Sequence, residues 1–169
     1  GVTKQYVYGS YIDEVLVIDQ NNDADASATG AGDRRLFIHT NTLSSVFALS
    51  DTAGVIVEGY LYDAYGQATI FSAGNNAVVD FGGDDVVTVA GSSGEGNPLL
   101  FTARRLDPET GLYYFRNRYI DSDQGRFISR DPIGWWANSD ELGHSMSYVG
   151  NSPPNATDPS GRVVINVHG

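Results

Sequence analysis

The chain contains no cysteine, which excludes disulfide bonds, thiolate nucleophiles and cysteine-based zinc sites together. Basic residues are also scarce: 10 Lys and Arg stand against 21 Asp and Glu, for a formal net charge of −11. A protein that grips phosphates needs a basic surface, so the composition argues against a nucleic-acid partner. An acidic surface is more typical of a protein that stays soluble in a salty or extracellular setting.

Long hydrophobic runs are missing as well. No apolar stretch approaches the roughly 18 residues of a transmembrane helix, so we expect no membrane span. No long segment repeats apolar residues at helical spacing either. The chain is rich instead in Gly (20 residues), Tyr (10) and Phe (7). Glycine permits tight turns and aromatic residues favour half-buried pleated surfaces, which predicts an all-β protein of many short strands.

Residues 1–71 alternate strand-like segments with turns of one kind. Asp51-Thr52-Ala53-Gly54 and Asp63-Ala64-Tyr65-Gly66 each open on Asp and close on Gly. In such turns the carboxylate accepts backbone N–H groups and Gly adopts a positive φ angle. We therefore predict antiparallel hairpins in series, interrupted by an acidic loop over residues 19–33. Residues 1–20 are expected to be strand material, including Tyr6, Tyr8 and the apolar run over 15–18. The other expected strands cover residues 36–40, 45–50, 55–62 and 67–71.

Residues 72–96 show only two weak strand patterns, 77–81 and 86–90, and are predicted to be a variable insertion or loop. The hairpin pattern then returns, with turns opening at Asp107 and Asp121. The predicted strands of this part are Leu99–Leu106, Leu112–Ile120 and Arg126–Ser129.

The middle strand of this second part has a two-faced pattern. If residues 112–120 are one strand, Tyr113, Phe115 and Tyr119 share the buried face, and Arg116 and Arg118 lie on the opposite one. Six of the ten basic residues fall between residues 104 and 130. We expect them to pair with the neighbouring acidic turns rather than to bind nucleic acid. After residue 130 the chain is rich in proline and holds both tryptophans, which predicts an irregular packed segment to residue 161 and a short tail over 162–169.

Several of these motifs resemble a known family. Tyr62-Asp63-Ala64-Tyr65-Gly66 is similar to the Tyr-Asp-x-x-Gly unit of RHS/YD-repeat proteins, and residues 97–134 resemble the RHS repeat-associated core domain. Residues 147–153 and Asp158-Pro159-Ser160-Gly161 resemble the end of that domain. The family includes bacterial RHS effectors, C components of insecticidal Tc toxins and animal teneurins. The resemblance implies β-hairpins that wind spirally into a hollow shell, with the core domain (residues 97–161) closing one end as a plug.

In toxin members the core is similar to an aspartic self-protease, which implies a catalytic pair of Asp131 and Asp158, with Arg130 in support. Two neighbouring carboxylates that share a proton supply an acid and a base, and such a pair can activate water against a peptide carbonyl. The same Asp-Pro-x-Gly motifs are also good turn sequences, so both could simply shape the plug. Toxin members usually carry Leu after the second motif, where this chain has Arg162 and then only Val163–Gly169. That departure favours an uncut module.

Metal and cofactor signals are weak. Asp19, Asn21, Asp23 and Asp25 alternate as in the start of a calcium loop, but Ala24 stands where an EF-hand needs Gly. The three histidines lack metal-ligand spacing. We expect a solvated loop and predict no metal site and no cofactor.

Three functions remain open. The first is a structural or encapsulating C-terminal core module of an extracellular or toxin-delivery protein. Its partners would be an upstream YD-repeat shell or a neighbouring copy, and a C-terminal toxin. The second is a self-cleaving aspartic peptidase that cuts near Arg162. The third is a cell-surface glycan-binding or adhesive module, suggested by the aromatic residues. All three place the protein outside the cell or on its surface, in a bacterium.

Overall fold

The computed structural model describes residues 3–10, 13–23, 25–89, 92–132, 145–162 and 164–166. Within them the chain is nearly all β, as predicted. Seven strands form one antiparallel sheet in which the order in space equals the order in sequence. They are β1 (Lys4–Tyr8), β2 (Val15–Gln20), β3 (Arg34–Thr40), β4 (Val46–Ser50), β5 (Ile56–Tyr62), β6 (Ala68–Ser72) and β7 (Val86–Val89).

The turns between these strands have the predicted chemistry. Asp51 Oδ1 accepts the N–H groups of Ala53 and Val55, at 2.9 and 3.0 Å. Asp63 Oδ1 makes the same pair of bonds with the N–H groups of residues 65 and 67, both at 2.9 Å. The closing glycines, Gly54 and Gly66, adopt φ angles of +81° and +96°. Serial hairpins are therefore set by local turn chemistry, and they are confirmed.

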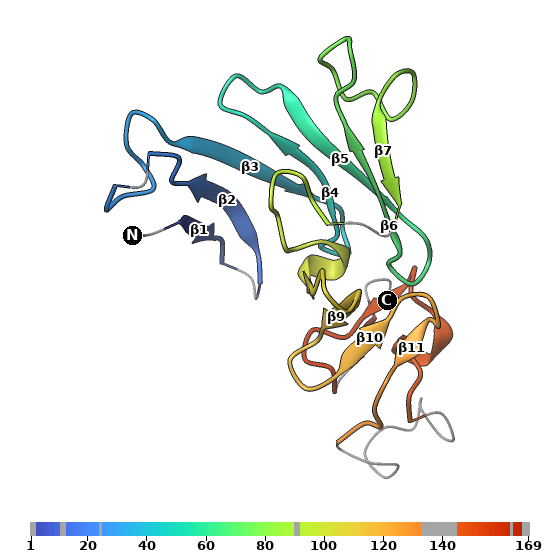
Figure 1. The fold of residues 1–169 in the computed structure, drawn as a ribbon. Coiled ribbons are helices and arrows are strands. Elements are labelled where there is room, and N and C mark those ends of the chain that lie inside the picture. Colours follow the sequence, from blue (N-terminus) through green and yellow to red (C-terminus); the bar gives the residue numbers. More distant parts are fainter. Residues whose placement is uncertain are drawn as a thin grey trace.

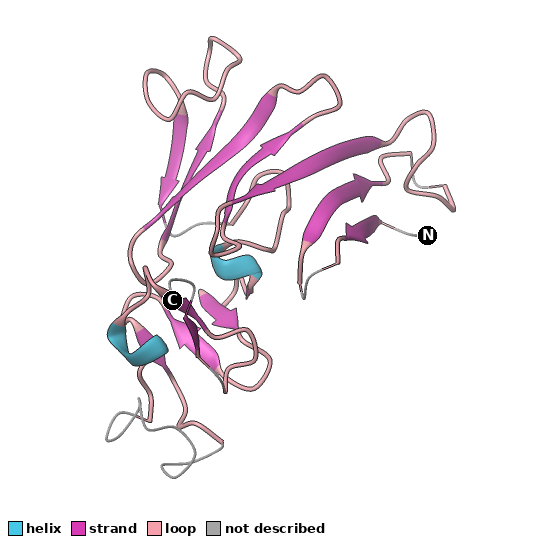
Figure 2. Ribbon diagram, turned by 180° about the vertical axis from the view of Figure 1, so that it is seen from behind, coloured by secondary structure: helices cyan, strands magenta, loops and turns pink. Residues whose placement is uncertain are grey.

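The sheet arches, and a smaller C-terminal unit lies beneath one end of it (Figures 1 and 2). β-Bulges shift the register between β3 and β4 and again between β4 and β5, and bulged strands bend. The unit has a four-stranded sheet in the order β11-β10-β9-β8 and a two-stranded sheet of β12 and β13. The bounds are β8 (Arg105–Leu106), β9 (Leu112–Tyr114), β10 (Tyr119–Asp121), β11 (Arg126–Phe127), β12 (Ala156–Thr157) and β13 (Ile165–Asn166).

Phe101 joins the large sheet to the C-terminal unit. Its ring lies 5.8 Å from the ring of Tyr62 on β5, 6.1 Å from that of Tyr113 on β9 and 6.0 Å from that of Tyr148. Gly66 leaves room for it, because a Cβ there would fall 2.6 Å from the Phe101 ring. One continuous core therefore runs from the arch into the unit below.

Three predicted strands are wrong, and the first of them, the weak pattern over residues 77–81, forms no strand. Leu99–Leu106 is interrupted at Phe101–Ala103, where the chain makes a single tight turn. Thr102 and Ala103 adopt φ angles of +47° and +55° there, which an extended strand does not allow. Leu112–Ile120 is two strands, β9 and β10, separated by a tight turn in which the Phe115 N–H donates to the Arg118 carbonyl at 2.8 Å. The turn changes which side chains are buried.

The prediction that residues 112–120 have one buried and one polar face is wrong, also because of this turn. The chain reverses at residues 115–118, so Tyr119 lies opposite Tyr114, and the two exposed rings are 5.1 Å apart. Arg118, expected on the face opposite the buried aromatics, is instead 2% exposed.

Residues 92–97 form a strap that is tied to four strands of the large sheet. Fully buried Glu58 on β5 accepts hydrogen bonds from Tyr60, from Ser93 and from the N–H of Gly94, the last at 2.7 Å. Glu95 pairs with Arg34 of β3. The carbonyls of residues 95 and 96 accept from side chains of β2 and β1, each at 2.6 Å.

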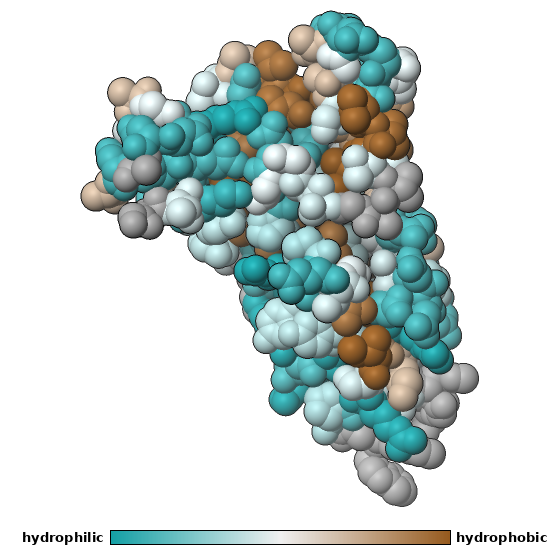
Figure 3. All heavy atoms as spheres, viewed as in Figure 1, coloured by the Kyte–Doolittle hydropathy of each residue, from teal (hydrophilic) through white to brown (hydrophobic). Residues whose placement is uncertain are grey.

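The surface of the face seen in Figure 3 is mostly hydrophilic, with apolar atoms gathered over β7 and the start of β5. Val86 and Val87 of β7 are 59% and 50% exposed. Among the described residues, no helix has the length and apolar character to cross a membrane.

We predict that Glu58→Gln loosens the strap. The amide group would turn N–H groups toward hydroxyl and N–H donors, and an unsatisfied buried polar group costs about 1–3 kcal/mol. Urea denaturation should show that loss in the free energy of unfolding. The exposed Glu109→Gln is the matched control and should change it by less than about 0.5 kcal/mol. Equal stability of the two variants would contradict the assigned role of Glu58.

Candidate functional site

The turn between β9 and β10 directs Arg118 inward. Arg116 adopts a φ angle of +64°, and the Asn117 N–H donates to the Phe115 carbonyl at 2.7 Å. The chain therefore reverses within residues 115–118. The Arg118 guanidinium then stacks on the ring of Phe127 on β11, with Cζ 3.5 Å from the ring centroid. A planar guanidinium suits such stacking, which fixes its orientation.

This buried guanidinium brings the two predicted aspartates together. Arg118 Nη2 lies 3.1 Å from Asp131 Oδ2 and 3.0 Å from Asp158 Oδ2. The side chains of Asp131 and Asp158 are 6% and 1% exposed. Because both carboxylates contact the same nitrogen atom, they are direct neighbours in the core, although 27 positions separate them in the chain. One guanidinium therefore contacts two carboxyl groups in a region that is almost closed to solvent.

Three successive residues of the turn hold three successive carbonyls of the segment after β12. Arg116 Nη1 donates to the Pro159 carbonyl at 3.0 Å, and Asn117 Nδ2 donates to the Ser160 carbonyl at 2.8 Å. Arg118 Nε donates to the Gly161 carbonyl at 2.7 Å. Residues 158–162, here named the tail, are thus docked through their backbone in one register.

Asp158 completes the attachment from the tail side. Its Oδ1 accepts the N–H groups of Ser160 at 3.2 Å and Arg162 at 3.0 Å. Gly161 adopts a φ angle of +69°, and a Cβ at this position would overlap the Phe115 carbonyl oxygen. Asp-Pro-Ser-Gly is therefore a turn and, at the same time, the place where the tail meets Arg118.

Ile133 and Gly134 of the first Asp-Pro motif lie outside the described residues, as do Trp135, Trp136, His144 and His168.

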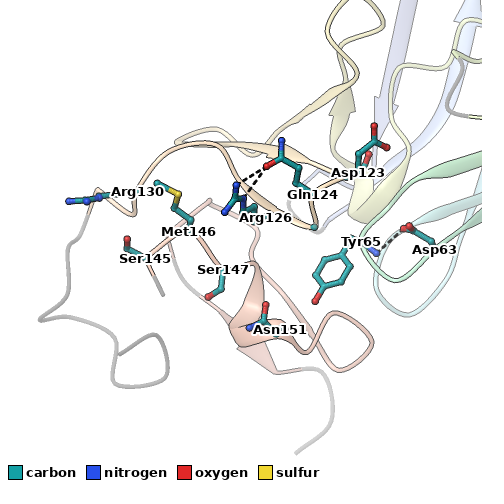
Figure 4. A pocket seen from close by; sticks show the side chains of 12 residues that line it. Asp63, Tyr65, Asp123, Gln124, Arg126, Arg130, Ser145, Met146, Ser147 and Asn151 are labelled. Carbon is teal, nitrogen blue, oxygen red and sulfur yellow. Dashed lines mark hydrogen bonds between the residues drawn. The ribbon is translucent and has the colours of Figure 1, made fainter. Parts of the chain in front are cut away.

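Arg130, the predicted supporting residue, is not the arginine that contacts the two aspartates; that arginine is Arg118. Arg130 is exposed and lines an open polar pocket of about 600 Å³ between the Asp63 turn, the β10–β11 turn and residues 145–151. Figure 4 shows Arg130 at one end of this pocket and Tyr65 toward the other. Sequence reasoning missed Arg118 because it placed this residue on the polar face of a continuous strand.

A second charged cluster flanks the first. Asp13, between β1 and β2, pairs with buried Arg104 and with Arg116, the latter at 2.6 Å. Arg104, Arg116 and Arg118 therefore pair with distant aspartates, and the expectation that they pair with the nearby acidic turns is wrong. Tyr148 packs against Phe115 and Phe127, and burial raises its pKa to about 12.

An acidic cluster lies in the loop before β3. Carboxylate oxygens of Asp23, Asp25 and Asp33 lie within 4.8 Å of one another. The Asp33 carboxylate already accepts the N–H groups of Asn22 and Gly30, at 3.0 and 2.5 Å. Asp19, which opened the calcium-like pattern, is instead buried on β2 and paired with Arg35. The absence of a metal site stays a prediction.

The chain resembles segments of known proteins. No family model matches the chain. The crystal structure of TcdB2-TccC3, a Tc toxin complex, matches 94% of the chain with a TM-score of 0.66 and 21% identity, over 7% of that chain. The tRNA(Glu)-specific nuclease WapA of Bacillus subtilis subsp. natto is 30% identical over 174 residues, covering 96% of this chain and 7% of WapA. The resemblance to the RHS/YD-repeat family is confirmed.

A further relative is the toxin protein Tse5 of Pseudomonas aeruginosa, 34% identical over 67 residues, or 40% of this chain and 5% of Tse5. The chain thus has the fold of an RHS-type module and resembles parts of toxin proteins. It spans only a small fraction of the length of each of these relatives.

We predict that Arg118→Met lowers the free energy of unfolding by about 3–5 kcal/mol, because two buried carboxylates lose their shared cation. Arg126→Met is the matched control: Arg126 is exposed and its guanidinium donates to the Gln124 amide oxygen at 2.8 Å. It should change stability by less than about 0.5 kcal/mol. Urea denaturation of both variants measures the difference, and a similar small loss in each would overturn the prediction.

Proposed function

We propose that this module is the encapsulating end of a toxin-delivery protein, secreted or exposed on the surface of a bacterial cell. The observation that carries the proposal is the docked tail: residues 158–162 end against the turn of residues 115–118, beneath one end of the arched sheet. A polypeptide joined to the tail would leave the module from a fixed point on the side where the C-terminal unit lies.

The arch supports the same proposal. Its strands succeed one another as simple hairpins, and β1 and β7 stand at the two edges of the sheet. An edge strand carries backbone N–H and C=O groups that pair with another strand. The partners would be hairpins of an upstream YD-repeat shell or a neighbouring copy on the β1 side, and a toxin joined beyond the tail.

A protease-protection experiment tests encapsulation. A reporter bearing a site for a specific protease is fused after Gly169, both in the full-length gene product and in the 169-residue chain alone. If the full-length protein closes a shell around the C-terminal cargo, the added protease should cut the reporter at least about tenfold more slowly there, since a buried backbone must open before it is cut. Equal cutting rates in the two proteins would refute an encapsulating role.

Self-cleavage near Arg162 is the second candidate function, and one observation favours it. Asp131 and Asp158 share a guanidinium, and that guanidinium also holds the Gly161 carbonyl, one residue before Arg162. A carboxylate pair beside a peptide held in place is the arrangement that acid–base hydrolysis needs. Asp131 would take a proton from the water as the water oxygen attacks the carbonyl carbon of a peptide bond near Arg162. That proton would pass to the departing nitrogen as the C–N bond breaks, and Asp158 would hold the tail. Arg130, which lines the polar pocket, would act on the aspartate pair only through its own positive charge.

Intact mass spectrometry of the reporter fusion tests the second function. The wild-type fusion should lose its reporter near Arg162, and Asp131→Asn and Asp158→Asn should keep it. The first variant loses the base, and the second loses the carboxylate that binds both Arg118 and the tail. Asp123→Asn, on an exposed turn, is the control and should be cut like the wild type. Cleavage of the wild type and of Asp131→Asn at the same rate would exclude this mechanism, and an uncut wild type would leave the encapsulating role alone.

A further inference from the structure

The second Asp-Pro-x-Gly motif of this chain is followed by Arg162, where the resemblance to RHS toxins implies Leu. The structure shows how this position contacts the module. The Arg162 side chain is exposed, whereas its backbone N–H donates to Asp158 Oδ1 at 3.0 Å. The bonds from the 115–118 turn to the tail also end on backbone atoms, the carbonyls of residues 159–161.

We infer that the proposed self-cleavage site recognises the main chain of residues 158–162 in a single register and does not read the side chain of residue 162. This inference rests on the proposed self-cleavage. The turn of residues 115–118 is the specificity-determining element, and Arg162 leaves the site competent. Its substrate is thus a backbone of fixed register, with Asp158 and Gly161 required within it.

The register is set by one donor per residue. Side chains 116, 117 and 118 bond carbonyls 159, 160 and 161 in the same order. A slip of the tail by one residue would move Asp158 away from the Arg118 nitrogen that it shares with Asp131. The slip would also bring Ser160 or Arg162 to the place of Gly161.

That place accepts only glycine. The φ angle of +69° is unfavourable for residues with a Cβ, and the Cβ itself would overlap the Phe115 carbonyl oxygen. The position two residues after the second Asp-Pro peptide is therefore a steric check on the register. Selectivity arises from shape and backbone bonding, both of which are independent of the residue at 162.

Within this arrangement Arg118 and Asn117 are positioning residues. Arg118 ties the Gly161 carbonyl to the aspartate pair, and its plane is fixed by Phe127. Asn117 is exposed, and its amide bonds the Ser160 carbonyl at 2.8 Å. Removing the Asn117 side chain takes away one contact to the tail and leaves the buried core untouched, so it tests recognition without testing folding.

The experiment measures self-cleavage rates of the full chain fused to a reporter after Gly169, by intact mass over time, with thermal unfolding recorded for each variant. Arg162→Leu should be cut within about threefold of the wild-type rate, as expected of a surface substitution. Asn117→Ala should be cut about fivefold more slowly, as expected for one lost hydrogen bond. Its unfolding temperature should fall by no more than about 4 °C, because only one exposed hydrogen bond is lost. Asn117→Gln, which keeps an amide donor, should recover most of the rate. Exposed Asn75→Ala is the matched control and should be cut like the wild type.

Gly161→Ala should be cut at least about a hundredfold more slowly, the usual effect of displacing a reacting group by an ångström. Cleavage of Arg162→Leu alone, with an uncut wild type, would overturn main-chain recognition while leaving the aspartate mechanism intact. An unchanged rate in Asn117→Ala would also overturn it. If neither the wild type nor Arg162→Leu is cut, the proposed self-cleavage is wrong and the inference falls with it.

Discussion

The charge balance around Arg118 governs how the C-terminal half of this protein is assembled. A buried guanidinium needs anionic partners, and here it finds two, Asp131 and Asp158, which approach from different parts of the chain. The arginine also needs a flat surface and receives the ring of Phe127. The β9–β10 turn, the β11 strand and the tail are thus positioned by one side chain.

The same arrangement unites the two interpretations of the Asp-Pro-x-Gly motifs. As a turn, the second motif caps its own backbone through Asp158 and uses Gly161 for a positive φ angle. As part of a charged site, it delivers a carboxylate to within 3.0 Å of Arg118. A structural role and a chemical role do not compete here, because the turn geometry is what presents the tail to the pair of carboxylates.

The fold could be predicted from the sequence wherever the cause is local. Asp51 and Asp63 cap N–H groups two and four residues away, and such turns carry a signature within a few residues. The turn at residues 115–118 lacks one, since the left-handed residue is Arg116 and not glycine. The strap of residues 92–97 could not be predicted, for a different reason. Residues 92–97 resemble a loose loop until Glu58, more than 30 positions earlier, binds them.

The residues of the candidate site also differ in whether the sequence could predict them. The aspartates were found through the resemblance of two short motifs, and their proximity is a tertiary fact. Arg118 carries no local mark that separates it from the other arginines of its region. Its importance comes from burial, and burial depends on the chain reversal that the alternating pattern concealed. Arg130, chosen because it adjoins Asp131 in sequence, is exposed, whereas Asp131 contacts the buried Arg118, so neighbours in sequence can have different surroundings.

The distance along the chain between the paired residues also sets an order of events during synthesis. The hairpins of the arch are local and can form as each one leaves the ribosome. Asp13 and Arg116, which form an ion pair, are 103 positions apart in the chain. Asp158 follows its partner Arg118 by 40 positions. The aspartate pair is therefore completed only after nearly the whole module has emerged. Assembly of the site thus marks the completion of the fold, and a cut made there would release a downstream segment only from a finished module.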